Sequence, residues 1–283
     1  MASVAAPTAN AAGLRASTLG IAKRGLLKYL RTPQLVVLGT IQGAMFLLIF
    51  RYVFGGAIGT DGGLNYVDFL VPGFITTGIL FSGMGAAAGV AEDLEQGFVD
   101  RLRSLPIPRS AVLAGRALAD TAVLVWGLLI TTAIGFAVGF RVHGSLADAL
   151  AAFGLLVVLG FAFEWLFITL GLFAGNAQAA QGLALMVFPL TFVSSAYVPV
   201  ESMPSWLEAF AKVNPFTVTV DAMRALWLGA PAGDSVWGAV AWTVAIAEAV
   251  RRLDDAGVGV DDIGVRRPTL DDVFITLTGR AAE

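Results

Sequence analysis

Long apolar runs separated by short polar breaks dominate the hydrophobic pattern of this chain. Five of them cover residues 33–54, 67–91, 117–140, 146–174 and 183–197. A helix needs roughly 20 apolar residues to cross a hydrocarbon core about 30 Å thick. We therefore expect an all-α membrane protein in which these runs are spans. A sixth run, residues 236–250, contains Glu248 and reaches only about 22 Å at 1.5 Å per residue, so it is marginal as a span.

The longest charged stretch, residues 92–116, lies between the second and third apolar runs. A charge at mid-bilayer costs about 2.5–3.5 kcal/mol on insertion scales. The stretch is therefore expected in water between two spans, where a soluble partner can reach it. Its charged residues are Glu92, Asp93, Glu95, Asp100, Arg101, Arg103, Arg109 and Arg116.

Two segments outside the apolar runs also predict helices. Residues 14–31 alternate basic and apolar side chains, which is typical of an amphipathic helix at a membrane surface with its basic face towards anionic headgroups. The alternative is an ordinary helix packed on the cytosolic face of the protein itself. Residues 199–231 are partly apolar but broken by four prolines, so they predict two short helices, 204–213 and 215–228, re-entrant or flat at the membrane face.

Composition supports an integral membrane protein and excludes several kinds of chemistry. Of the 283 residues 57% are hydrophobic and 14% are charged, against about 25% charged in soluble domains. There is no cysteine and one histidine, which excludes disulfides and a histidine cluster for a metal. No GxxxxGK[ST] phosphate loop is present, so the chain cannot hydrolyse ATP by P-loop chemistry. We expect no catalytic residue, no metal or cofactor bound by this chain, and no nucleic-acid partner.

The distribution of Lys and Arg predicts the orientation. With the N-terminus in the cytoplasm, the cytoplasmic segments carry fourteen basic residues and the outer ones carry four. Cytoplasmic loops carry the excess of Lys and Arg. The charged stretch is therefore expected in the cytoplasm and the proline-broken hairpin outside.

Glu164 is the one acid deep within a predicted span. Such residues are candidates for a functional role, here the binding of a cationic amphiphile or a proton. The alternative is a protonated or hydrogen-bonded structural acid, and the sequence does not choose between them. Aromatic side chains in the spans, among them Phe81 and Trp165, could line an apolar route beside it, although aromatics in spans more often pack or face lipid.

Two stretches carry a resemblance to a known family. Residues 71–120, VPGFITTGILFSGMGAAAGVAEDLEQGFVDRLRSLPIPRSAVLAGRALAD, and residues 188–229, FPLTFVSSAYVPVESMPSWLEAFAKVNPFTVTVDAMRALWLG, resemble the membrane subunits of type-2 ATP-binding-cassette (ABC) exporters. The daunorubicin-resistance permease type is the most similar group, and the resemblance covers about residues 15–245. It implies six membrane helices, or five and one short helix, with cytosolic interfacial and coupling helices and an outer re-entrant helical hairpin.

The resemblance also implies partners and a site. It implies cytosolic ABC ATPase subunits that use ATP and Mg, a second permease copy in a homo- or heterodimer, and a coupling helix that enters a cleft on the ATPase. The residues that match the family's acidic-Gly-basic pattern are Glu92, Asp93, Glu95, Gly97, Asp100, Arg101, Arg103, Ser104, Leu105 and Pro106.

The C-terminal 35 residues depart from that family. They predict a helix over 247–256, a strand over 258–265 and a helix over 269–277, and RRPTLDDVFITLTG resembles the end of the partner ATPase in the same exporters. We expect a permease joined to an ATPase-like tail; a cytosolic extension private to this chain is the alternative. The expected organisation is a tail and interfacial helix (1–32), a permease domain (33–250) and a soluble cytosolic tail (251–283).

Two classes of function are compatible with these features. The first is the membrane subunit of an ATP-driven exporter in the inner (plasma) membrane, which moves an amphipathic drug, lipid or glycoconjugate out of the cytoplasm. The second is a membrane scaffold or a channel-like subunit that transports nothing. Dependence of ATPase binding on the charged stretch discriminates between them.

Overall fold

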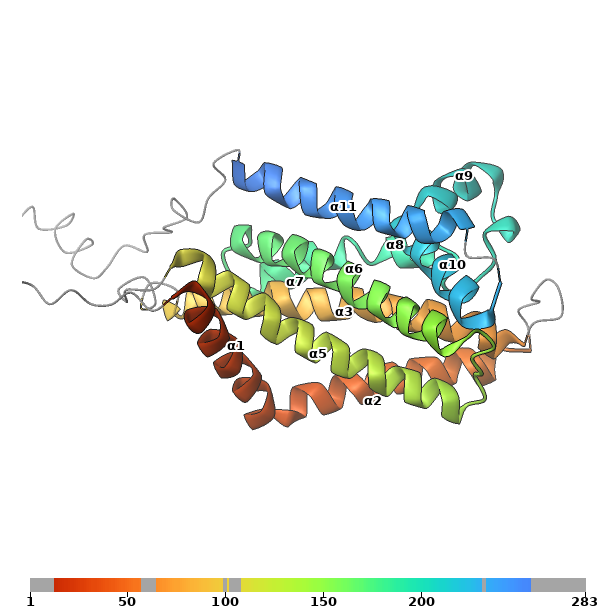
Figure 1. Cartoon of the computed structure of the whole chain (residues 1–283), viewed down its shortest axis with the longest axis horizontal. Helices are drawn as coiled ribbons and strands as arrows, with labels where there is room; N and C mark the ends of the chain where they lie inside the picture. The colour runs from red at the N-terminus through yellow and green to blue at the C-terminus, as the bar shows by residue number, and fades with distance from the viewer. Residues whose placement is uncertain (1–12, 57–64, 99–100, 102–107, 231–232, 256–283) are drawn as a thin grey trace, which may run out of the picture.

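Helices make up the regular structure of the chain (Figure 1). The computed structural model describes residues 13–56, 65–98, 101, 108–230 and 233–255, and no strand occurs among them. This confirms the prediction of an all-α membrane protein. The strand and helix expected at 258–265 and 269–277 lie outside the described residues.

Four helices among the described residues are long and apolar enough to cross a membrane. The first is α2 (Pro33–Ile49), continued by the π-helical turn η1 (Phe50–Phe54), and the others are α3 (Tyr66–Glu95), α5 (Arg109–Ala137) and α6 (Leu146–Phe173). They match the first four predicted spans. The main differences are that α3 continues beyond residue 91 and that α5 begins before residue 117, so charged residues extend both helices at one end of the bundle.

The core forms around α3, which packs closely on α6. A Cβ placed on Gly83 of α3 would lie 2.1 Å from the ring of Phe167 on α6, so only glycine permits this approach. Of the apolar window of α3, 61% is buried inside the protein, against 6% for α2. The helix that leads into the charged stretch is therefore the most enclosed of the four, while α2 is the most exposed.

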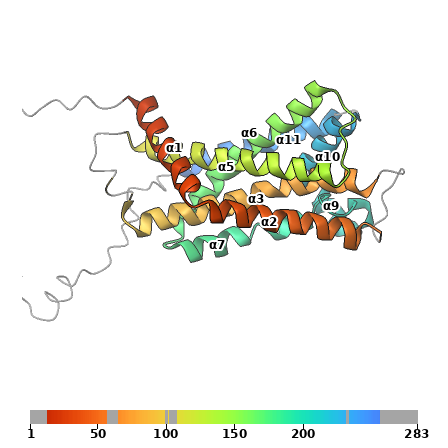
Figure 2. The same cartoon turned by 90° about the horizontal axis from the view of Figure 1, so that it is seen from below.

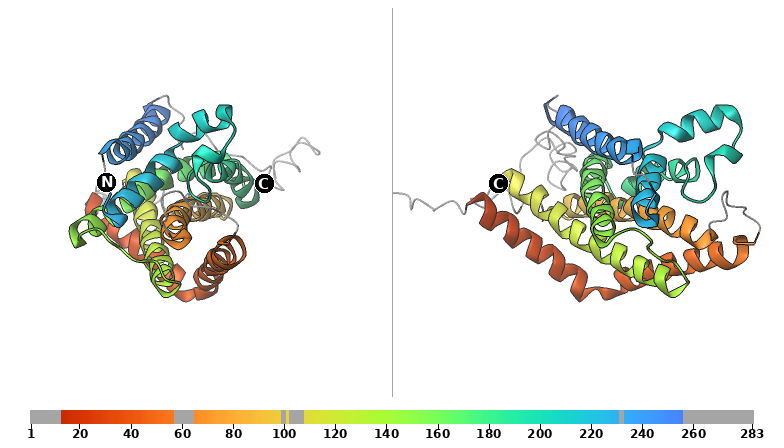
Figure 3. Two further views of the ribbon diagram at one scale, coloured as in Figure 1. Left: turned by 90° about the vertical axis from the view of Figure 1, so that its right-hand side faces the viewer. Right: turned by 45° about the vertical axis from the view of Figure 1, so that its right-hand side comes forward.

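The N-terminal helix α1 (Leu14–Arg31) lies along α5 and meets α2 at an elbow around Thr32. Its bounds agree with the predicted helix 14–31. Figure 3 shows α1 and α2 on the side of the bundle opposite the last helix, α11 (Gly233–Asp255). The contact of α1 with α5 agrees with the alternative of a helix packed on the protein itself. Leu19 and Leu30 of α1 are nevertheless exposed.

The fifth predicted span is wrong as a continuous helix. The chain instead forms α7 (Ala177–Leu185), a turn, and α8 (Pro189–Phe192). The polar residues before residue 183 belong to α7, whose N-cap Asn176 accepts a hydrogen bond from the backbone N–H of Ala179 at 2.8 Å. Pro189 has no N–H to continue a helix and starts α8 instead. α7 packs beside α3, on the side that Figure 2 shows next to α2.

The two helices of the hairpin occur where they are predicted. They are α9 (Ser205–Val213) and α10 (Pro215–Leu228), preceded by the short 3-10 turn η3 (Val200–Ser202). Asn214 caps α10 by accepting from the backbone N–H of Phe216 at 2.9 Å. Figure 1 shows the hairpin at the end of the bundle opposite the charged end of α3.

Arg224 joins α10 to the first turns of α3. Its Nε and Nη2 donate to the carbonyl oxygen of Phe69 at 3.0 and 2.9 Å, and its guanidinium lies 3.6 Å from the centre of the Phe69 ring. It also donates to the carbonyl oxygen of Ser195 and to Asp221. Pro72 lies within the same part of α3 and removes one of its backbone donors. The hairpin is therefore fixed on α3 at its proline-containing turns.

The last described helix differs from the expectation for residues 236–256. The sequence predicts a 15-residue run and a separate helix over 247–256, but α11 is one helix of 23 residues, or about 34 Å. It is long enough to cross a membrane, yet it is not among the four apolar helices. Polar turns at both ends make the helix longer than its apolar run, so hydropathy alone underestimates its length. These turns contain Asp234, Glu248, Arg251 and Arg252.

Candidate functional site

The predicted coupling residues that the structure describes gather at the charged end of α3. Glu92, Asp93 and Glu95 lie on its last turn, not in a separate segment after the span. Gly97 ends the helix with φ +63°, a conformation that favours glycine, and its N–H donates to the carbonyl oxygen of Leu94 at 3.0 Å. Arg101 follows one turn later. Asp100, Arg103, Ser104, Leu105 and Pro106 lie outside the described residues.

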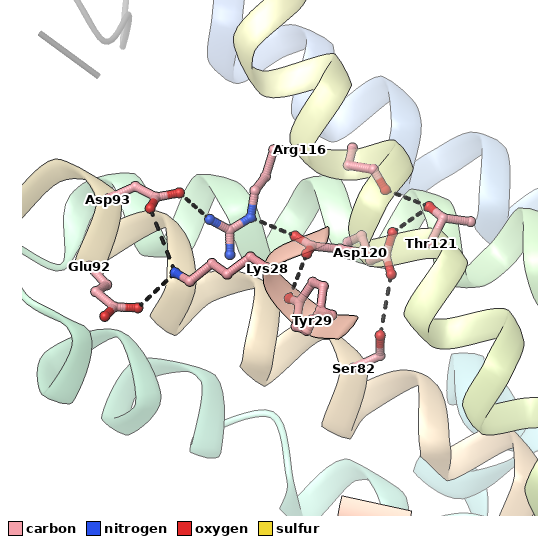
Figure 4. A network of polar contacts seen from close by, with 10 residues as sticks. Lys28, Tyr29, Ser82, Glu92, Asp93, Arg116, Asp120 and Thr121 are labelled. Atoms are coloured by element: carbon pink, nitrogen blue, oxygen red, sulfur yellow. Dashed lines mark hydrogen bonds and ion pairs between the residues drawn. The ribbon is translucent and has the colours of Figure 1, made fainter. Parts of the chain in front are cut away.

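A network of charges ties this end of α3 to α5 and α1 (Figure 4). Arg116 of α5 pairs with Asp93 of α3 and, through Nε, with Asp120 of its own helix at 2.9 Å. Lys28 of α1 reaches Glu92 at 3.4 Å and Asp93 at 4.0 Å. The side chain of Arg116 is 14% exposed and that of Asp120 is 3% exposed. Two carboxylates therefore share one largely buried guanidinium where three helices meet.

Tyr29 completes the network from α1. Its hydroxyl donates to Oδ1 of Asp120 at 2.8 Å. Burial, and then the negative charge of Asp120, raise the pKa of the Tyr29 phenol well above its usual range, so it remains a hydrogen-bond donor. Nearby, the guanidinium of Arg24 lies 3.7 Å from the centre of the Phe98 ring, just beyond Gly97. α1 thus contacts both the last turn of α3 and the segment that follows it.

Sequence reasoning missed part of this network. Asp120 is an acid near the start of the predicted third span, where an intramembrane acid is also a functional candidate. The spacing of Arg116 and Asp120, four residues apart on a predicted helix, also indicates an ion pair. No sequence pattern points to Lys28 and Tyr29 as partners, because they come from a helix interpreted as facing lipid headgroups.

Glu164 lies close to this network but is closed off from water. It is 0% exposed, and its carboxylate accepts hydrogen bonds from Thr121 of α5 at 2.6 Å and Ser82 of α3 at 3.3 Å. Of the two readings left open by the sequence, this geometry agrees with a hydrogen-bonded structural acid that joins α3, α5 and α6. Asp120 and Thr121 are consecutive, so the two polar clusters meet on one turn of α5.

Phe81, Trp165 and Glu164 do not share one cavity wall. Phe81 is 47% exposed and lines a groove, where its ring meets that of Phe188 edge-on at 5.8 Å between centroids. Trp165 packs in a small apolar cluster with Ile168 and its neighbours. Glu164 lies one side chain behind the groove, since Ser82 touches both. Of these three residues, only Phe81 lines the groove.

The groove itself lies between α1, α2, α3 and α5 and has a volume of about 950 Å³. Its walls carry the ionic network at one end, through Lys28, Asp93 and Arg116, and apolar side chains at the other, including Trp126. Among the described residues, no group of three His, Cys, Asp or Glu side chains is placed to hold a metal ion. The arrangement is suited to binding and to mechanical coupling.

Comparison with known proteins agrees with this architecture. The sequence profile of the family described as "ABC-2 type transporter" matches residues 17–228. The daunorubicin resistance ABC transporter permease protein DrrB1 of Streptomyces coeruleorubidus is 31% identical over 207 residues, which cover 73% of each chain. The probable doxorubicin resistance ABC transporter permease protein DrrC of Mycobacterium tuberculosis is 27% identical over 235 residues, or 82% of this chain and 84% of the relative.

A more distant relative carries a less specific name. The inner membrane transport permease YadH of Escherichia coli is 26% identical over 202 residues, covering 69% of this chain and 76% of the relative. All three relatives are named as permeases, the membrane component of a transporter. With four apolar helices of spanning length, the chain is a multi-pass membrane protein. The profile match and the relative at 31% identity establish that the chain belongs to the ABC-2 type transporter family.

Proposed function

We propose that this chain is the membrane subunit of an exporter driven by a separate ATPase, and that it moves an amphipathic drug, lipid or glycoconjugate out of the cytoplasm. Its N-terminus lies in the cytoplasm and it resides in the inner (plasma) membrane. ATP and Mg are used by the partner ATPase. A second permease copy, the same or different, completes the membrane part.

The observation that carries the proposal is the charged end of α3. α3 is one helix of 30 residues that is enclosed by the rest of the bundle and ends in Glu92, Asp93 and Glu95. Arg116 and Lys28 link this end to α5 and α1. A force applied to the segment beyond Gly97 would therefore reach three helices together, because packed helices and buried ion pairs move as a unit.

Two further facts support the direction and the energy source. The chain has no phosphate loop, so energy must come from another subunit. With the N-terminus in the cytoplasm, fourteen of the eighteen basic residues belong to sequence segments assigned to the cytoplasmic side, in agreement with the excess of Lys and Arg that cytoplasmic loops carry. Two of the relatives are named for resistance to daunorubicin and doxorubicin, which favours an amphipathic cargo.

The test is co-purification of the full chain with its ABC ATPase from detergent-solubilised membranes. Arg101→Glu reverses a charge beyond Gly97, and Gly97→Pro imposes φ of about −65° where the chain has φ +63°. We expect either change to reduce the bound ATPase about tenfold or more, as for the loss of a charged hot-spot contact.

The matched controls lie at the opposite end of the bundle. Lys212→Glu reverses an exposed charge that forms an ion pair with Glu208 on its own helix, and Gly139→Pro places proline at another glycine with positive φ. Both should keep the ATPase bound. A chain that binds no ATPase, or whose Arg101→Glu variant binds it as well as the wild type, would refute the proposal, and ion conduction by the chain alone would favour a channel-like subunit.

A further inference from the structure

The groove between α1, α2, α3 and α5 contains more empty space than helix packing explains. Glycines normally let membrane helices approach closely. Six of the glycines that line this groove would meet nothing within 4 Å if a Cβ were added; they are Gly20, Gly39, Gly43, Gly78, Gly85 and Gly127. On α3 the contrast is direct, because Gly83 touches Phe167 whereas Gly85 faces open space. The small side chains therefore widen a cavity here.

The groove is long enough for an extended hydrocarbon chain. Its α5 wall runs from Arg116 to Thr131, which corresponds to about 22 Å along the helix axis. The hydrocarbon core of a bilayer is about 30 Å thick, so the groove spans more than one leaflet. Trp126 on this wall is 53% exposed, and Phe81 on the α3 wall is 47% exposed. These large apolar surfaces lack a protein partner in the direction of the groove.

The end of the groove at α1 is positively charged. Its acids already have partners, since Asp93 and Asp120 pair with Arg116 and Glu92 pairs with Lys28. Lys23 and Arg31 also line the groove, are exposed, and have no acidic side chain within ion-pair distance among the residues that the structure describes. Within the described part of the chain, the charge left unpaired at this end is therefore positive.

We propose that the groove binds an anionic phospholipid of the leaflet that meets α1, with its headgroup at Lys23 and Arg31 and an acyl chain between the glycines of α2 and α3. An apolar trough of this volume with cations at one end complements an amphiphile with a negative head. The apolar part of a helix from a second chain copy would also fill the trough but would offer no negative charge to the two cations. The site is independent of ATP and of transport.

The experiment is native mass spectrometry of the full-length, delipidated chain titrated with phosphatidylglycerol or with phosphatidylcholine of the same acyl chains. We expect phosphatidylglycerol to bind more tightly. Lys23→Gln and Arg31→Gln should each weaken it about fivefold, since one basic residue near a membrane surface contributes about 1 kcal/mol, with phosphatidylcholine unaffected. Arg15→Gln removes an exposed charge from α1 outside the groove and should change binding less than about twofold.

The walls are tested separately. Gly43→Leu and Gly85→Leu fill the trough and should abolish the binding of both lipids, whereas Gly154→Leu, at a glycine of α6 that faces open space elsewhere, should not. The same spectra report oligomeric state. Equal binding of the two lipids, or loss of a dimer with lipid binding intact in the Gly→Leu variants, would overturn the proposal, the latter by assigning the groove to a second copy. No ATPase is present, so the outcome is separate from that of the export test.

Discussion

Removing the guanidinium of Arg116 should be among the most damaging single changes at the charged end of α3. In Arg116→Leu, Asp93 and Asp120 lose the cation that they share, and Asp120 has a side chain only 3% exposed. Breaking a buried ion pair by removing one partner costs about 3–5 kcal/mol, because the remaining charge stays buried without compensation. Folded domains are stable by about 5–15 kcal/mol, so this loss is a large fraction of the total.

The chain contains a closely matched comparison. Arg252 and Glu248 on α11 form an ion pair with the same spacing of four residues and the same 2.9 Å distance as Arg116 and Asp120, but Arg252 is 76% exposed. Exposed pairs of this kind gain little, because water screens them and holding two long side chains costs entropy. Arg252→Leu should therefore leave the free energy of unfolding unchanged within error.

The assay is reversible unfolding of the purified chain in mixed micelles, followed by loss of helical circular dichroism and by tryptophan fluorescence. Arg116→Leu should lower the free energy of unfolding by about 3–5 kcal/mol. In Arg116→Leu/Asp120→Asn one uncompensated charge is gone, so the double variant should recover part of that loss as a coupling energy. If Arg116→Leu and Arg252→Leu destabilise equally, burial of the pair is not what sets its energy, and the reasoning fails.

Three further changes test other contacts, by the same unfolding assay. Arg224→Gln should cost about 1–3 kcal/mol because it removes the charged donor to the carbonyl oxygen of Phe69, and an unchanged stability would show that the hairpin is held otherwise. Gly73→Ala should cost about 1–3 kcal/mol, since its Cβ would lie 2.1 Å from a backbone oxygen, whereas Gly154→Ala, with nothing within 4 Å, should be neutral or stabilising. Glu164→Gln keeps both hydrogen bonds and should be tolerated, while Glu164→Leu removes the acceptor of Ser82, leaves Thr121 only the carbonyl oxygen of Ala117, and should cost about 1–3 kcal/mol; equal effects would contradict the structural assignment.

Hydropathy located the long helices well and their polar ends poorly. The four spans and the hairpin helices agree with the sequence, because apolar runs and prolines report directly on membrane insertion and helix starts. The errors lie where charged residues continue a helix out of the apolar layer, as at Glu95 of α3 and Arg109 of α5. A helix ends at a backbone signal such as Gly97, not at the edge of the hydrocarbon.

The break between α7 and α8 shows a different limit. Residues 183–197 are mostly apolar and carry no charge, so hydropathy predicts one span. Two residues in the sequence do indicate the break. Asn176 is a typical N-cap and precedes α7, and Pro189 is a typical first residue of a helix and begins α8. Non-helical backbone inside a membrane is tolerated only where protein surrounds it, so hydropathy alone does not predict this break. Here Asn214 donates from its side chain to the carbonyl oxygens of Leu190 and Val193 at 2.7 and 2.6 Å.

The acidic residues of the candidate site can be predicted from the sequence, but the residues of α1 that contact them cannot. Glu92, Asp93 and Glu95 follow from the charged stretch, and the Arg116–Asp120 pair follows from helical spacing. The hydrogen bond from Tyr29 to Asp120 joins residues 91 positions apart, and its existence depends on how α1 lies against α5. Contacts of this kind come from tertiary packing, on which a single sequence carries little information.

The buried charges of the Arg116 network fix how three helices pack against one another, and do not mainly add stability. Replacing a buried ionic cluster by well-packed apolar side chains is often neutral or stabilising, so stability alone does not account for it. Arg116 pairs with both Asp93 and Asp120, and Lys28 lies beside Asp93. These contacts form together in only one relative register of α1, α3 and α5. We therefore expect an apolar triple variant, Arg116→Met with Asp93→Leu and Asp120→Leu, to stay folded, with a loss of about 1–3 kcal/mol from the lost acceptor of Tyr29, yet to lose ATPase-driven transport. Retention of full transport by a stable triple variant would show that register at this end of α3 is not what coupling requires.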